Sequence, residues 1–410
     1  MDTASSPQKN NLLLTLLSAE LAAIFFFVPA GRFHINLGFY DFTTGYDAYK
    51  LFPILYATWL GWRWREGWKQ KTGSPLLEPM LLWFLCSFFA AIASWNPYQA
   101  LTESLELFCY LMFFIMLIDL PWLRMRTGWI AGGFVLGNLY LCGAALWQLA
   151  TAHSGGGLLR LNAVFDHPNQ LGGYAVLAAP LLGWLSLQSK SHWLKQCVLL
   201  VAVGVLCAGA LTLSRSVYVA FAAAGFTLIV FGSRTQRIAG AVLAITLLVA
   251  ALIAAPSIGQ RFGELLDPAQ LRDDASRLLI WSALFDSAAP DLPHFGVGYG
   301  PILQDRLNNW IASAPATGLP LSQWGPHSAY LATLLCVGLP GLCAYLWLLA
   351  SAYQQARQCP PAERVLLLAA LTGAVVHQAF IFPILTGNYP IALVTLFALA
   401  SLRSQPEEMP

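Results

Sequence analysis

The chain has 410 residues, of which 57% are hydrophobic and only 10% are charged. Soluble globular domains carry about 25% charged residues, so this composition excludes a soluble domain and indicates a protein that is solvated by lipid. The formal net charge of +2 gives no reason to expect a nucleic-acid partner.

Twelve apolar segments are candidates for membrane spans. A span takes about 20 apolar residues, and a helix satisfies all of its own backbone groups in lipid. The candidates lie near residues 11–30, 49–62, 76–95, 100–120, 128–150, 168–187, 193–211, 215–231, 237–256, 328–350, 363–382 and 388–402. We therefore predict an all-α polytopic integral membrane protein with about twelve transmembrane helices.

The positions of the basic residues predict how these helices are oriented. If the N-terminus is cytoplasmic, most of the 22 Lys and Arg residues fall in cytoplasmic segments, as the positive-inside rule requires for short loops. Both termini are then cytoplasmic. We expect one membrane domain over residues 1–410, because no segment has the composition of a separate soluble module.

One loop on the outer side is much longer than the others. It covers residues 257–326, between the ninth and tenth predicted helices. Long loops in compact folds are usually functional. We expect this loop to be partly helical, with one helix capped by Ser276 and ended by Pro290, and a second over about 302–311.

A shorter outer loop precedes the sixth predicted helix. It runs through Arg160 to His167, Pro168 and Asn169. Proline is favoured in the first turn of a helix, so His167 and Asn169 are predicted at a helix N-terminus, where backbone N–H groups bind anions. Arg160 is a candidate for the same ligand, although a loop arginine is more commonly solvated.

Two further arginines are predicted on the outer side. Arg215 stands between two spans that almost no loop separates, and Arg277 begins the first helix of the long loop. Guanidinium groups bind phosphates through charge-assisted, often bidentate, hydrogen bonds. The alternatives are an Arg215 side chain that reaches to lipid headgroups and an Arg277 paired with Asp273 or Asp274.

His327 directly precedes the tenth span. The positive end of the helix dipole favours a neutral imidazole, which can act as a general base near pH 7. The alternative is an interfacial histidine that only caps the span. Pro340, within the same span, is predicted to kink the helix.

Two other features receive structural interpretations. The segment Phe295-Gly-Val-Gly-Tyr-Gly300 superficially matches a dinucleotide-binding turn, but it follows no strand, so we interpret it as a turn. His377 and Gln378 lie inside the eleventh predicted span, where a buried, hydrogen-bonded pair is the simpler interpretation.

Four elements in this order resemble the O-antigen ligase family, whose superfamily includes O-antigen polymerases and protein O-oligosaccharyltransferases. They are Phe165-Asp-His-Pro-Asn169, Ser214-Arg215-Ser216, Arg277 with Trp281 and the following Phe295-Gly-Val-Gly, and His327. His327-Ser328, Gly338 and Gly341 also fit the histidine and glycine spacing of the ligase signature.

This resemblance implies a fold similar to that of lipid-carrier glycosyltransferases of the GT-C type. It implies an enzyme of the bacterial inner membrane that joins an O-antigen glycan, carried on undecaprenyl diphosphate, to a sugar hydroxyl of lipid A–core at the periplasmic face. The reaction would be inverting and independent of metal or other cofactors. His327 is the expected catalytic residue, and Arg215, Arg277, Arg160, His167 and Asn169 are expected to bind the diphosphate or other substrate groups.

Other functions remain open at this point. An O-antigen polymerase would use a second carrier-linked glycan as acceptor, and a protein O-oligosaccharyltransferase would use a protein hydroxyl. A transporter of lipid-linked glycan would place polar residues at mid-membrane. A membrane scaffold would tolerate the loss of both Arg215 and His327.

Overall fold

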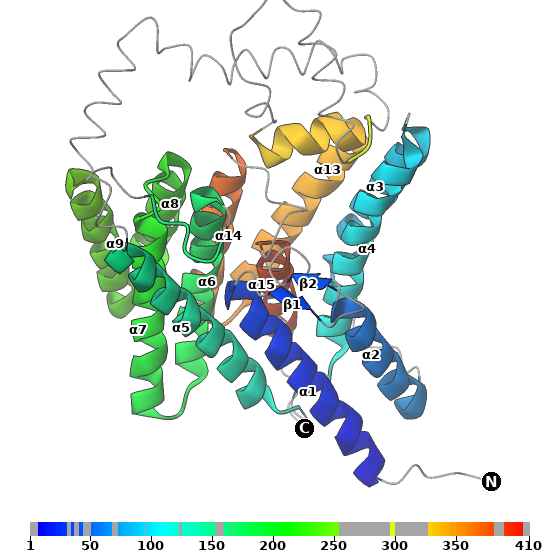
Figure 1. Ribbon diagram of the computed structural model, residues 1–410, viewed down its shortest axis with the longest axis horizontal. Helices are drawn as coiled ribbons and strands as arrows, with labels where there is room; N and C mark the ends of the chain where they lie inside the picture. The colour runs from blue at the N-terminus through cyan, green and yellow to red at the C-terminus, as the bar shows by residue number, and fades with distance from the viewer. Residues whose placement is uncertain are drawn as a thin grey trace, which may run out of the picture.

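The computed structural model describes residues 7–30, 34–36, 41–43, 51–67, 73–94, 96–122, 125–151, 160–165, 167–253, 296–299, 327–380 and 389–404. It contains a helix at each of the twelve predicted positions (Figure 1). They are α1 (Pro7–Ala30), α2 (Phe52–Glu66), α3 (Leu77–Ala93), α4 (Pro97–Asp119), α5 (Thr127–Thr151), α6 (Pro168–Gln188), α7 (His192–Ala210), α8 (Arg215–Phe231), α9 (Arg234–Ile253), α13 (Ala329–Gln358), α14 (Pro361–Gln378) and α15 (Tyr389–Ser404).

Six of these helices are long and apolar enough to cross a membrane: α1, α4, α5, α6, α7 and α13. Three more, α3, α8 and α15, are apolar but shorter. Large hydrophobic side chains also point outward from the middle of helices, as Leu200 and Phe226 do with 72% and 66% exposure. Exposed apolar side chains of this kind face lipid at no cost, and the chain is a multi-pass membrane protein.

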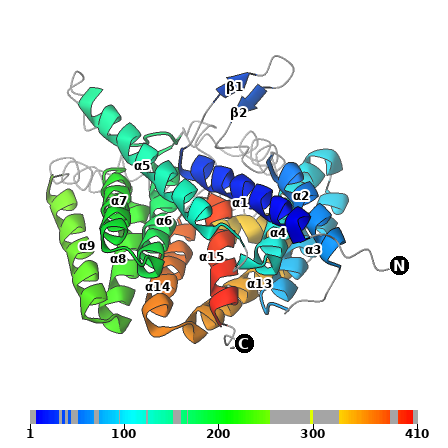
Figure 2. The same cartoon turned by 90° about the horizontal axis from the view of Figure 1, so that it is seen from below.

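The bundle is all-α as predicted, and one small hairpin lies beside it. Two short strands, β1 (His34–Asn36) and β2 (Asp41–Thr43), pair in antiparallel register, with His34 opposite Thr43. This hairpin projects from the helices between α1 and α2 (Figure 2). Hydropathy over long windows detects spans and does not detect strands of three residues, so no strand was predicted between the first two spans.

Two helices form the centre of the bundle. Eleven of the 16 residues of α15 and 12 of the 21 residues of α6 are buried. A helix that is apolar on all sides is one that other helices surround. In Figure 2, α15 lies between α1 and α5 on one side, α14 with α7 to α9 on another, and α2, α3 and α4 on a third.

Two glycines fix the position of α6, because they let side chains of neighbouring helices lie against its backbone. A Cβ atom on Gly172 would lie 2.1 Å from the Val217 Cγ2 atom of α8, and one on Gly173 would lie 2.5 Å from the His377 Cε1 atom of α14. Glycines at these positions therefore let α8 and α14 pack directly onto the first two turns of α6. This packing positions the N-terminus of α6 beside that of α8.

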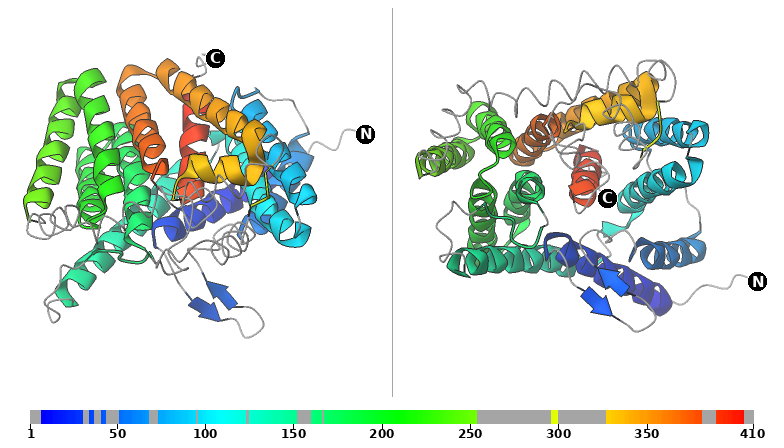
Figure 3. Two further views of the ribbon diagram at one scale, coloured as in Figure 1. Left: turned by 90° about the horizontal axis from the view of Figure 1, so that it is seen from above. Right: turned by 45° about the horizontal axis from the view of Figure 1, so that its top comes forward.

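Helix α13 is interrupted. Gly338 has φ 72° and ψ −176°, which separates a first half, Ala329–Val337, from a second half that continues to Gln358. The predicted kink near Pro340 is therefore confirmed, and the break lies two residues before the proline. The first half lies across the top of the second in Figure 1, and Figure 3 shows the same bend from above.

Buried ion pairs lie at one end of the bundle. Glu363 on α14 accepts hydrogen bonds from Arg403 on α15 at 2.8 and 2.5 Å and from Trp184 on α6 at 2.8 Å. Arg63 on α2 pairs with Asp119 at the end of α4. We call the other end, where His167 and His327 lie, the histidine end.

Candidate functional site

At the histidine end, α6 begins as the sequence predicts. Pro168 occupies the first turn and His167 is the N-cap residue, whose Nδ1 accepts a hydrogen bond from the Asn169 backbone N–H at 3.1 Å. Because Nδ1 accepts, the neutral imidazole carries its proton on Nε2. The Asn169 side-chain oxygen is buried and has no hydrogen-bond partner among the described residues.

The loop before α6 is fixed to the turn between α7 and α8. The Leu161 N–H donates to the Leu211 carbonyl at 3.1 Å, and the Arg160 Nε donates to the Thr212 carbonyl at 3.3 Å. This turn ends at Arg215, the first residue of α8. Two basic residues that are far apart in sequence, Arg160 and Arg215, are therefore brought to one turn.

Helix α5 supports the same loop. The Gln148 side-chain oxygen accepts from the Asn162 and Ala163 N–H groups at 3.2 and 2.7 Å, and its amide donates to the Asn162 side-chain oxygen at 2.6 Å. One glutamine thus satisfies two backbone donors and holds the loop that carries Arg160.

His327 precedes α13, whose N-cap residue, Ser328, accepts a hydrogen bond from the Leu331 N–H at 3.4 Å. The His327 backbone is left-handed, with φ 41°. Only two other non-glycine residues of the described part have positive φ, Ala163 and Leu213, and both lie in the segments just described. Such conformations cost about 1–3 kcal/mol each and cluster at functional sites.

Electrostatic coupling links these segments. Burial of the ring lowers the pKa of His167 from its ordinary value, and the charges of Arg160 and then of His327 lower it further. Electrostatic interactions weaken with distance, so these three residues lie in one region. Arg160 also contacts the turn that ends at Arg215, and we call Arg160, His167, Arg215 and His327 the basic cluster.

The cluster has a common electrostatic character. The N-termini of α6 and α8 lie side by side, and that of α13 opens onto the same region. Each has a basic residue in its first turn or just before it: His167 at α6, Arg215 at α8 and His327 at α13. A helix N-terminus carries partial positive charge and normally attracts acidic side chains. None of the three helices has an acidic residue in its first turn, and a helix N-terminus of this kind is a favourable place for an anion.

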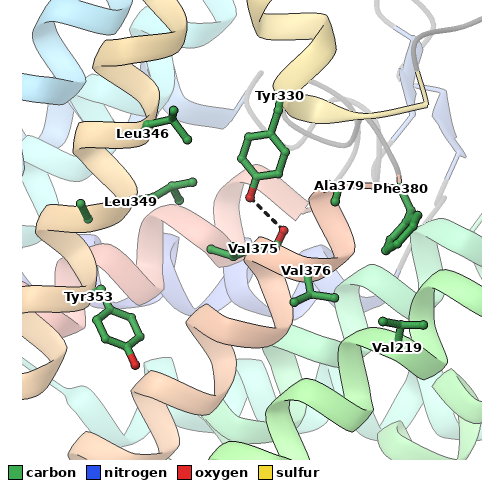
Figure 4. A pocket seen from close by; sticks show the side chains of 10 residues that line it. Val219, Tyr330, Leu346, Leu349, Tyr353, Val375, Val376, Ala379 and Phe380 are labelled. Carbon is green, nitrogen blue, oxygen red and sulfur yellow. Dashed lines mark hydrogen bonds between the residues drawn. The ribbon is translucent and has the colours of Figure 1, made fainter. Parts of the chain in front are cut away.

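An apolar groove lies beside the cluster (Figure 4). Its volume is about 650 Å³, and it is formed by α8, α13 and α14. Val219, one turn after Arg215, and Tyr330, three residues after His327, both line it. The Tyr330 hydroxyl donates to the Val375 carbonyl at 2.8 Å, which leaves the groove lining almost wholly apolar.

The pair His377 and Gln378 is buried, as predicted, but only half of it is hydrogen-bonded. Gln378 accepts from the Tyr345 hydroxyl at 2.5 Å and donates to the Tyr389 hydroxyl at 3.1 Å. Neither ring nitrogen of His377 has a hydrogen-bond partner among the described residues. The histidine packs against Gly173 in the core, outside the basic cluster.

Not every predicted site residue can be placed. Arg277, most of the loop 257–326 and the two helices predicted there lie outside the described residues. Within the described part, no three His, Cys, Asp or Glu side chains converge as a metal site would require. Tyr330 was not predicted to belong to the site, and its position three residues after His327 is the local signal that could have indicated its place in the groove.

The sequence is similar to a known protein family. No curated protein matches the chain. A sequence model of the O-antigen ligase family matches residues 198–346, a region that includes Arg215, Gly296–Tyr299 and His327 and follows Arg160, His167 and Asn169. This match supports the predicted resemblance: residues 198–346 are similar to the O-antigen ligase family.

Proposed function

We propose that the protein is an O-antigen ligase, which transfers a glycan from undecaprenyl diphosphate to a sugar hydroxyl of lipid A–core at the periplasmic face of the bacterial inner membrane. The observation that carries the proposal is the basic cluster, whose residues begin α6, α8 and α13 at one end of the bundle beside an apolar groove. A prenyl diphosphate has the matching chemistry, with an anionic head and an apolar chain.

The apolar groove supports a lipid-linked donor. Its open, apolar lining starts next to Arg215 and His327 and continues along α13 to Tyr353. A diphosphate held at the basic cluster would place the first part of its prenyl chain in this groove, whose apolar side chains replace lipid contacts without exposing the chain to water.

The reaction follows from the residues of the cluster. His327 accepts the proton of the acceptor hydroxyl as its oxygen attacks the anomeric carbon of the donor glycan. The bond between that carbon and the diphosphate oxygen breaks, and the electron pair remains on the diphosphate. Arg215, Arg160 and Arg277 stabilise the added negative charge, and attack opposite the leaving group inverts the anomeric centre.

The proposal is tested by transfer in proteoliposomes. The purified full-length chain is supplied with defined undecaprenyl-diphosphate glycan and lipid A–core, and product is followed by gel shift and mass spectrometry. We expect core capped with glycan. Glycan chains that lengthen on the carrier without lipid A–core would identify a polymerase, and movement of donor between leaflets without any new bond would identify a transporter.

A prediction on pH follows from His167. Its pKa is lowered in the free protein, so the ring is neutral at pH 7. A bound diphosphate would stabilise the imidazolium and raise this pKa, so binding takes up a proton and becomes tighter as the pH falls toward 6. Calorimetry of a short prenyl diphosphate, in buffers of different ionisation enthalpy, measures this uptake.

The control for this measurement is His167→Gln, which keeps a polar side chain without a charge. Protonation of the diphosphate itself contributes equally in both proteins, so the difference between them belongs to His167. Equal proton uptake by the wild type and His167→Gln would show that this histidine does not contact the anion.

A further inference from the structure

The Gly296–Tyr299 segment occupies an unexpected position. It lies in the break of α13, between that helix and the α3–α4 pair, and is drawn in yellow beside α13 in Figure 1. The Val297 N–H donates to the Leu335 carbonyl at 3.1 Å, and the Gly298 N–H donates to the Cys336 carbonyl at 2.8 Å. Its sequence alone indicated only a turn.

The sequence of α13 explains why these two carbonyls have no donor within their own helix. In a continuous helix, the Cys336 carbonyl would accept from residue 340, but Pro340 has no N–H. The turn at Gly338 likewise separates Leu335 from its usual donor, residue 339. Both residues are buried, and a buried carbonyl without a partner costs about 1–3 kcal/mol, so the segment replaces the two hydrogen bonds that the break removes.

The fit requires both glycines. Gly296 and Gly298 have φ of 70° and 86°, a region that side chains disfavour. A Cβ on Gly296 would lie 2.5 Å from the Leu335 carbonyl oxygen, and one on Gly298 would lie 2.9 Å from the Ala100 Cβ of α4. Contact this close leaves no room for any other residue without displacing α13 or α4.

Side chains attach the segment on both sides. Ser94, at the end of α3, donates from its Oγ to the Val297 carbonyl at 3.0 Å. The Tyr299 hydroxyl donates to the Thr333 Oγ1 at 3.4 Å, and both of these residues are fully buried. The segment therefore joins α3 and α4 to the first half of α13.

The first half of α13 is also the helix that follows His327. A left-handed residue such as His327 keeps its conformation only when its surroundings fix it. The half helix is short, nine residues from Ala329 to Val337, so its orientation depends on what holds its far end.

We propose that Gly296–Tyr299 and Ser94 are positioning residues, which hold the first half of α13 so that His327 faces the other residues of the basic cluster. This inference rests on the proposed function for its catalytic consequence. The segment touches no reacting atom, and it acts through the half helix.

The test is Gly298→Ala in the reconstituted full-length protein. We expect kcat for glycan transfer to fall roughly 10- to 100-fold, because a misplacement of about 1 Å can cost about 100-fold. The KM for the donor should stay nearly unchanged, because Arg160 and Arg215 are held by α5, α7 and α8. The matched control is Gly143→Ala on α5, where a Cβ would meet nothing within 4 Å.

A second readout does not depend on transfer. Diethyl pyrocarbonate modifies accessible neutral histidines, and peptide mapping gives the rate at each one. We expect the rate at His327 to change in Gly298→Ala and to stay constant in Gly143→Ala, with His192 as an unchanged internal reference. If the wild type transfers no glycan, the proposed function fails, while this labelling still tests the positioning role.

Two variants that add no volume guard against simple misfolding. Ser94→Ala and Tyr299→Phe each remove one hydrogen bond of the segment, and we expect smaller effects in the same direction on kcat and on His327 labelling. Unchanged kcat per folded molecule and unchanged labelling in Ser94→Ala, Tyr299→Phe and Gly298→Ala would overturn the inference. So would a fall in folded protein with a normal kcat, which is the behaviour of a purely structural segment.

Discussion

Replacing His327 with alanine is expected to lower kcat for glycan transfer roughly 10²- to 10⁴-fold, the usual contribution of a general base. The acceptor hydroxyl would then attack without a group to take its proton. The donor KM should change little, because the diphosphate is bound by arginines on other elements. The measurement is initial rate against donor concentration in proteoliposomes of equal protein content.

Two further variants make this result specific. His327→Asn removes the base but keeps a residue that tolerates a left-handed backbone, which separates lost chemistry from lost backbone geometry. His192→Ala is the matched control, since His192 also opens a helix, α7, but lies at its exposed end away from the basic cluster. If His327→Asn kept the wild-type kcat, His327 would not be the general base.

The helices of this protein could be predicted from its sequence because one physical property defines them. Apolar runs long enough for a bilayer are visible in composition alone, and each of the twelve predicted runs contains a described helix. The ends of the helices are less well defined by the sequence. Helix α13 continues to Gln358, past the predicted end near residue 350, because its last two turns are polar and hydropathy does not detect polar helix. Gln355 in this part contacts Ser404 of α15.

The candidate site was predictable in its parts and not in its assembly. His167, Pro168 and Asn169 show a helix start in their local sequence, and so do Ser214 and Arg215. The contact between Arg160 and Thr212 joins residues 52 positions apart, and no local pattern encodes it. The structure therefore adds what the sequence lacks, which is the proximity of these segments.

The segment at Gly296 illustrates the same limit. Its glycines were correctly interpreted as a turn, since turn geometry is a local property. Their role in the fold depends on two carbonyls of α13. These carbonyls lack a donor within the helix because Pro340 and Gly338 interrupt it. The kink near Pro340 and the turn at Gly296 were predicted separately, and in the structure they contact each other.

Arg215→Ala should have the second large effect. In other enzymes, removal of one group that stabilises developing negative charge lowers kcat roughly 10²- to 10³-fold. We expect a loss of that order in Arg215→Ala, together with weaker binding of the donor. Arg215→Lys should recover only part of the loss, because an ammonium group cannot bind a phosphate through two parallel hydrogen bonds. Rates and donor KM are measured at several salt concentrations.

The matched control is Arg234→Ala. Arg234, like Arg215, is exposed and is the first residue of its helix, α9, so the two substitutions change the same charge at the same helical position. They differ in place, because Arg234 lies at the end of α8 and α9 opposite the basic cluster. If surface charge or interaction with lipid headgroups were the cause, both variants would lose activity equally. Loss in Arg215→Ala alone would assign the effect to the anion that binds where α6, α8 and α13 begin.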